Sequence, residues 1–137
     1  MISLLIETPI SPARRALSVL LVDDSKVVRK RLKEMLAEAC EDCELLEADA
    51  PNIALETLKA RYIDVVIMDI RMPGGSGMDA IADIKAARPD AVVIMLTNYS
   101  DSYYKNRCIE MGADQFYDKS SEFDLVIEAV RSLANLD

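Results

Sequence analysis

The chain has 137 residues and a formal net charge of −8, with 51% apolar and 29% charged residues. That length suits one domain, and that apolar share is enough for a packed core. The acidic balance argues against nucleic acid as a direct partner, because its phosphates would repel the chain. No apolar run approaches the roughly 20 residues of a membrane-spanning helix, so membrane insertion is not expected.

Residues 1–17 are expected to form an N-terminal extension, followed by one domain over residues 18–137. The apolar patch at residues 2–6 precedes Arg14 and Arg15, whereas a secretory signal places its positive charges first. A cytoplasmic location is therefore expected.

The chain has three cysteines, at positions 40, 43 and 108. A small, odd number of cysteines is not typical of a disulfide framework. Cys40 and Cys43 form a C-x-x-C pair, which elsewhere is a redox motif or half of a zinc site. The chain has no histidine and no second cysteine pair, which disfavours zinc. Because the pair follows a predicted helix rather than opening one, we interpret Cys40 and Cys43 as thiols in a reducing compartment.

Strand and helix patterns alternate along the chain. Short runs that are apolar at every position, such as VLLV, predict strands that are covered on both faces. Longer segments with apolar residues three and four positions apart predict helices. In chain order we expect strand 19–22, helix 26–39, strand 44–48, helix 52–60, strand 65–68, helix 78–87, strand 92–96, helix 101–111, strand 114–118 and a last helix with Ser121 as its N-cap.

Five strand–helix units predict an α/β fold with a doubly wound, five-stranded parallel sheet. Crossovers between parallel strands are right-handed, which places helices on both faces of the sheet. Five strands favour the flavodoxin-like order 2-1-3-4-5. The strands at 44–48 and 114–118 have polar ends, so they are expected at the two edges.

Polar side chains follow the predicted strands. The first strand is followed by Asp23 and Asp24, the third by Asp69, and the fifth by Lys119, while Thr97 follows the fourth. Because the carboxyl ends of parallel strands meet at one edge, these side chains are expected to lie together.

Three neighbouring carboxylates need positive charge, since two charges about 4 Å apart repel by roughly 4 kcal/mol at an effective dielectric near 20. Lys119 supplies one charge, and Mg²⁺, which prefers carboxylate and phosphate oxygens, is the expected source of the rest. Helix capping does not explain Asp69, because Met-Pro-Gly rather than a helix start comes shortly after it.

With these features the chain resembles the receiver domain of two-component response regulators, over about residues 18–134. The resemblance rests on the order and position of its motifs. They are the acidic pair after the first strand, D-x-x-M-P-x-x-x-G from Asp69 to Gly77, Thr97, Lys119, and the aromatic Phe116 three residues before that lysine.

The resemblance implies a phosphorylation-dependent signalling receiver of the (βα)5 type. Asp69 would be the phosphoacceptor, receiving its phosphoryl group from a histidine kinase or a histidine phosphotransfer protein. Asp24 and Asp69 would bind Mg²⁺ directly, Asp23 through water, and Arg71 through its backbone carbonyl.

The resemblance also implies a switch. Lys119 and Thr97 would contact the phosphoryl group, and Phe116 would turn inward as Thr97 moves. The face made by the fourth helix, fifth strand and fifth helix would then change for a downstream effector protein. The chain is expected to be a stand-alone receiver that catalyses at most its own phosphorylation and dephosphorylation, and homodimer formation stays open.

Two residues depart from the family pattern. Ser120 follows Lys119 where the family usually has proline, often after a cis bond, so a trans loop and a different lysine approach are expected. Asn98 follows Thr97 where the family has a small residue. Arg71 and Tyr99 occupy positions that in this family modulate the lifetime of the acyl phosphate.

Three alternatives stay open at this point. The first, motivated by Asn98 and Ser120, is a receiver-fold interaction module that signals without phosphorylation. The second is an aspartyl phosphatase, which is disfavoured because Arg71 stands where those enzymes carry a second aspartate. The third is an FMN carrier, disfavoured because Asp23 and Asp24 would repel the flavin phosphate.

Overall fold

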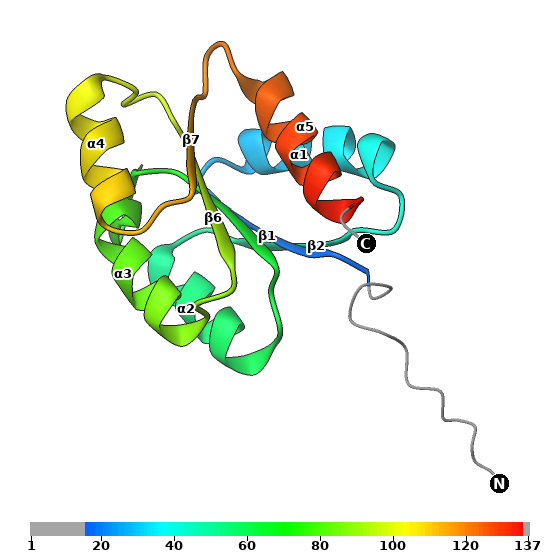
Figure 1. Ribbon diagram of the computed structural model, residues 1–137, viewed down its shortest axis with the longest axis horizontal. Coiled ribbons are helices and arrows are strands. Elements are labelled where there is room, and N and C mark those ends of the chain that lie inside the picture. The colour runs from blue at the N-terminus through cyan, green and yellow to red at the C-terminus, as the bar shows by residue number, and fades with distance from the viewer. Residues whose placement is uncertain (1–15, 136–137) are drawn as a thin grey trace, which may run out of the picture.

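The computed structural model describes residues 16–135. The N-terminal extension expected at residues 1–17 therefore lies outside the described residues, apart from its last two. Helices and strands alternate along the chain, as the sequence predicts (Figure 1). In chain order they are β1 (Ser18–Val22), α1 (Lys26–Ala39), β2 (Glu44–Ala48), α2 (Pro51–Ala60), β3 (Val65–Met68), β4 (Arg71–Met72), β5 (Gly75–Ser76), α3 (Gly77–Ala87), β6 (Val92–Thr97), α4 (Ser102–Glu110), β7 (Gln115–Asp118) and α5 (Phe123–Ala134).

Five strands form one parallel sheet in the order β2-β1-β3-β6-β7. Since β4 and β5 form a separate two-stranded sheet, this order is 2-1-3-4-5 when the five strands are counted along the chain. The predicted doubly wound, flavodoxin-like fold is confirmed. Strands β2 and β7 lie at the two edges, as their polar ends indicated.

Helices α1 and α5 cover one face of the sheet, and α2, α3 and α4 cover the other (Figure 1). Successive side chains of a strand point to opposite faces. Leu20 and Val22 therefore belong to the core under α2–α4, and Val19 and Leu21 belong to the core under α1 and α5. Strands β1 and β3 are buried at every position, which explains why their sequences are apolar throughout. None of the helices in the described range is long and apolar enough to cross a membrane.

Local capping residues determine several helix ends. The Ser25 side chain accepts a hydrogen bond from the Val28 N–H at the start of α1. The Asp101 carboxylate does the same for α4 through the Tyr104 N–H. Gly112 follows α4 with a φ of +117°, a conformation that favours glycine and ends the helix.

The prediction that Ser121 caps the last helix is wrong. Glu122 is the N-cap residue of α5, it makes no side-chain cap bond, and the helix begins at Phe123. The Ser121 N–H instead donates to the Asp118 carbonyl in a turn that follows β7. Because this turn includes Ser121, the N-cap position falls one residue later, at Glu122.

A two-stranded hairpin follows β3 and was not predicted. Its β4 and β5 strands pair antiparallel, with Arg71 opposite Ser76 and Met72 opposite Gly75. The turn uses Gly74, whose φ is +90°. The hairpin lies directly after Asp69 and leads the chain back to the start of α3, so it shapes one wall of the region described next.

The interpretation of Cys40 and Cys43 as thiols is wrong, because the two residues form a disulfide. The turn between α1 and β2 brings their Cα atoms to 5.5 Å from each other, a distance that a disulfide can span. The third cysteine, Cys108, is a buried thiol, and burial raises its pKa to about 11. The cysteines therefore give no support to the expectation of a reducing compartment.

Candidate functional site

Three carboxylates meet at the carboxyl edge of the sheet, as the strand order requires. Asp23 follows β1 and Asp69 follows β3, and both are buried, whereas Asp24 is exposed at the rim. Ligand oxygens of the three side chains all lie within 4.8 Å of one another. The parallel ladder continues one residue beyond the strands, because the Asp69 N–H donates to the Val22 carbonyl and the Asp23 N–H donates to the Ala48 carbonyl. The sheet backbone therefore positions both buried carboxylates.

Lys119 bridges the two buried carboxylates. Its Nζ lies 2.8 Å from Asp23 Oδ2 and 2.7 Å from Asp69 Oδ2. The Lys119 N–H donates to the Thr97 carbonyl at 2.8 Å, which extends the β6–β7 pairing and brings the lysine to the same edge. The remaining oxygens are also used, since Asp69 Oδ1 accepts from the Ile70 N–H and Asp23 Oδ1 accepts from the Ser25 N–H.

The electrostatics of the cluster favour further positive charge. Burial raises the pKa of the Asp23 carboxyl, and hydrogen bonds from Lys119 and Ser25 only partly offset that effect. Burial by itself would lower the pKa of Lys119, but its hydrogen bonds to Asp23 and Asp69 outweigh burial and raise the pKa. Ionised Asp23 is therefore held at a cost in folding free energy that another cation would reduce.

The donor set fits a hard divalent cation such as Mg²⁺. The three carboxylates offer only oxygen ligands, and one of them, Asp24, is open to solvent. Three carboxylates and one ammonium leave a formal charge of −2, which a divalent ion neutralises.

The two expected switch residues occupy adjacent strands. Thr97 ends β6 and is fully buried, and its Oγ1 accepts a hydrogen bond from the Tyr99 N–H at 3.1 Å. Phe116, in β7, is half-buried against the core under α2–α4. It lines a hollow of about 190 Å³ between α4 and the start of α5, together with Ser100 and Asp118.

The segment around Ser120 replaces the family proline with hydrogen bonds. The described residues contain no cis peptide bond. The Asp118 carboxylate accepts from both the Ser120 N–H and its hydroxyl, and from the Ser100 hydroxyl at 3.0 Å. These hydrogen bonds lower the pKa of Asp118, and those from Ser120 have the largest effect. With this trans loop Lys119 still contacts both carboxylates, and Asn98, the other departure, is exposed at the rim.

Sequence reasoning missed three contributors to the site's geometry. Gly77, at the start of α3, packs directly against the backbone carbonyl of Asp69. Asp118 organises the loop that carries Lys119. The Arg71 side chain contacts Tyr104 of α4. Gly77 stands in the D-x-x-M-P-x-x-x-G motif and Arg71 was singled out by its position after Asp69, but no sequence pattern predicted these contacts.

The family model of the response regulator receiver domain matches residues 19–131. The chain therefore belongs to the response regulator receiver domain family, and the resemblance inferred from its motifs is confirmed. This membership places it in two-component, phosphorylation-dependent signalling.

Known relatives and structures agree with this assignment. The response regulator UvrY of Escherichia coli O6:H1 is 31% identical over 117 residues, which are 85% of this chain and 54% of UvrY. The chain thus spans about half the length of that relative. The signal receiver domain of an HD domain-containing protein from Pseudomonas fluorescens Pf-5 superposes with a TM-score of 0.80 at 25% identity, covering 91% of each chain. The beryllofluoride-activated NtrC4 receiver domain dimer has a TM-score of 0.73 at 29% identity, covering 86% of this chain and 98% of that chain.

Proposed function

We propose that Asp69 accepts a phosphoryl group in an Mg²⁺-dependent reaction and that the chain relays this signal to a partner protein. One observation carries the proposal above the others. Lys119 bridges two buried carboxylates at the edge of the sheet where the strand order reverses, with a third carboxylate exposed beside them. An interior ion pair alone would not need the extra, open carboxylate of Asp24.

For the metal, Asp24 and Asp69 are the proposed direct ligands, Asp23 would bind through water, and Arg71 would contribute its backbone carbonyl. When bound, Mg²⁺ supplies positive charge that stabilises the transferring phosphoryl group. The reactive group itself belongs to the chain.

In the proposed transfer, a carboxylate oxygen of Asp69 forms a bond to phosphorus as the bond from phosphorus to the donor breaks. The donor is a phosphohistidine of a kinase or phosphotransfer protein, or a small acyl phosphate. Lys119, which already contacts Asp69 Oδ2 at 2.7 Å, is placed to exchange that contact for a phosphoryl oxygen. Its raised pKa keeps the ammonium charged for this role.

For the switch, we propose that Thr97 exchanges its contact with the Tyr99 N–H for one with the phosphoryl group. Phe116 would then move toward the space that the threonine leaves, and the face formed by α4, β7 and α5 would change for a downstream effector protein. The hollow of about 190 Å³ beside Phe116 lies between α4 and the start of α5, so one side of this ring is not held by core packing.

The experiment is phosphoryl uptake measured by intact-protein mass spectrometry after incubation with acetyl phosphate and Mg²⁺. We expect one phosphoryl group on the wild type and none on Asp69→Asn. Asp90→Asn, at an exposed turn before β6, is the matched control and should be modified like the wild type. Uptake by Asp69→Asn, or no uptake by the wild type in Mg²⁺, would overturn the assignment.

The partners and location belong to the same proposal. We expect a histidine kinase or phosphotransfer protein as donor, a cytoplasmic location where such a donor presents its phosphohistidine, and an effector protein as reader. The dimer of the NtrC4 receiver domain motivates a test of self-association. Size-exclusion chromatography with and without beryllofluoride would show whether this chain dimerises in the activated state. If beryllofluoride does not change the elution volume, activation does not act through self-association, and the downstream effector is expected to be a different protein.

A further inference from the structure

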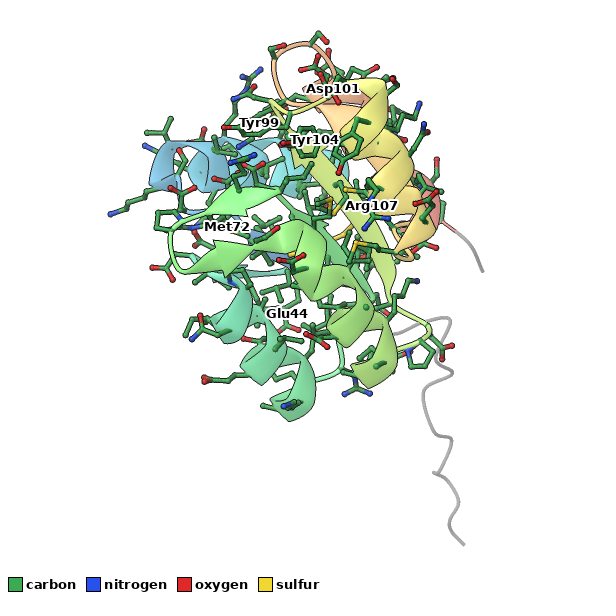
Figure 2. The ribbon with its side chains drawn as sticks, turned by 90° about the vertical axis from the view of Figure 1, so that its left-hand side faces the viewer. Glu44, Met72, Tyr99, Asp101, Tyr104 and Arg107 are labelled. Carbon is green, nitrogen blue, oxygen red and sulfur yellow. A yellow bond between two sulfur atoms is a disulfide. The ribbon has the colours of Figure 1, made fainter. Side chains whose placement is uncertain are left out.

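The Arg71 side chain takes part in an aromatic cluster beside the carboxylate site. Its guanidinium donates a hydrogen bond from an Nη to the Tyr104 hydroxyl at 2.8 Å, and it lies over the Tyr99 ring, 4.7 Å from the ring centroid. The Tyr99 and Tyr104 rings meet edge to face with centroids 5.6 Å apart. Figure 2 shows these two side chains next to each other at one end of the molecule.

The cluster joins three segments that each have a separate link to the site or to α4. Arg71 is two residues after Asp69 in the chain, and its carbonyl is a proposed metal ligand. Tyr99 donates its N–H to Thr97 Oγ1. Tyr104 lies in the first turn of α4, where its N–H donates to the cap residue Asp101. A displacement of the guanidinium would therefore change the contacts of Tyr104 in the first turn of α4.

The guanidinium lies close in sequence to a cluster of opposite charge, yet its contacts are with the two tyrosines. The carboxylate cluster with Lys119 has a formal charge of −2, and Arg71 is only two residues from Asp69. Within residues 16–135, the buried carboxylates pair with Lys119, and Arg71 makes no ion pair with the cluster. The tyrosine hydroxyl and the two ring faces compete for the guanidinium and hold it.

We propose that Tyr99 and Tyr104 are positioning residues for metal binding, which hold the Arg71 guanidinium away from the carboxylates and so couple Mg²⁺ occupancy to the first turn of α4. This inference rests on the proposed Mg²⁺ site. Released from the tyrosines, the guanidinium would approach the carboxylates and compete with the metal. Conversely, Mg²⁺ neutralises the cluster, removes the attraction, and strengthens the contact between Arg71 and Tyr104. The two effects are reciprocal because they describe one coupling free energy.

The Arg71 side chain borders open space on the side of the hairpin. A hollow of about 390 Å³ lies between the β4–β5 hairpin and α4, and both Arg71 and Tyr104 line it. The Arg71 side chain is exposed, so no core packing would have to be broken when it moves. This route reaches α4 through Arg71 and Tyr104, and it meets the proposed movement of Thr97 at the Tyr99 N–H.

The first test is a double-mutant cycle on Mg²⁺ affinity, measured by isothermal titration calorimetry. Tyr104→Phe keeps the ring and removes the hydroxyl, and it should weaken Mg²⁺ binding by about two- to fivefold, as expected for one exposed hydrogen bond. In an Arg71→Ala background the same substitution should have no effect, since no guanidinium is left to compete. Tyr103→Phe, a neighbouring ring that is 62% exposed, is the control and should bind like the wild type.

The second test is amide hydrogen exchange in residues 99–107 with and without Mg²⁺. Mg²⁺ should slow exchange there in the wild type and in Tyr103→Phe, but not in Tyr104→Phe. A residue with a merely structural role would change exchange equally in both conditions. Equal Mg²⁺ affinity and equal Mg²⁺ response in Tyr104→Phe and wild type would overturn the inference alone. If the wild type itself does not bind Mg²⁺, both the inference and the proposed metal site are wrong.

Discussion

Substitution of Gly77 by alanine tests whether the start of α3 positions Asp69, the proposed phosphoacceptor. A Cβ added at Gly77 would lie 1.9 Å from the Asp69 carbonyl oxygen and 3.0 Å from both the Asp69 carbonyl carbon and Met68 Cγ. Since real Cβ contacts are essentially never shorter than 3.0 Å, the oxygen and the new methyl must separate by more than 1 Å. The obstacle is backbone, so no side-chain rotation relieves it.

The displaced segment is held on both sides. The Gly77 N–H donates to the Ile70 carbonyl at 2.7 Å, and the Asp69 N–H donates to the Val22 carbonyl at 3.2 Å. Overpacking of a buried site costs about 1–3 kcal/mol, and with backbone on both sides we expect about 3 kcal/mol of lost unfolding free energy. A carboxylate misplaced by about 1 Å can lose about 100-fold in reaction rate. Phosphorylation of Asp69 is therefore expected to slow by that order.

Urea unfolding and the rate of phosphoryl uptake from acetyl phosphate measure the two effects. Gly74→Ala is the matched control, because Gly74 has a φ of +90° but no atom within 4 Å of an added Cβ. It should lose about 1 kcal/mol from backbone strain alone and keep its phosphorylation rate. If the unfolding free energy of Gly77→Ala lies within about 0.5 kcal/mol of the wild-type value, the close packing of α3 against Asp69 is refuted.

Three further predictions concern the carboxylates and the cysteines. Because the pKa of Asp23 is raised above its ordinary value of 3.8, its ionised form costs stability at pH 7, so Asp23→Asn should be more stable than the metal-free wild type in urea. That advantage should shrink as the pH falls through the raised pKa toward 3.8 and Asp23 becomes protonated; an advantage that grows on acidification would contradict the sign. Ellman's reagent should detect no thiol in the native protein, one in urea from Cys108, and three after reduction; three thiols in urea without reductant would exclude the disulfide. The disulfide between Cys40 and Cys43 closes a loop of only four residues. Replacing both cysteines by serine should therefore lower the unfolding free energy by at most about 2 kcal/mol. A loss well beyond that would show that the disulfide also holds α1 against β2.

The sheet and the cluster of charged side chains at its edge could be predicted because both depend on local sequence. A strand covered on both faces needs apolar residues at every position, and the runs at 19–22, 65–68 and 92–96 meet that condition. Once those strands are parallel, topology alone brings Asp23, Asp69 and Lys119 to one edge. The structure places them there, with Lys119 in contact with both aspartates.

Only the tertiary structure determined the contacts between residues that no local sequence pattern relates. Arg71 and Tyr104 are 33 residues apart and meet only because α4 packs beside the β4–β5 hairpin. Likewise, the clearance at Gly77 depends on how closely α3 approaches Asp69. Periodicity reports which face of a strand or helix is buried. It does not report distances between elements, which follow from side-chain packing across the whole core.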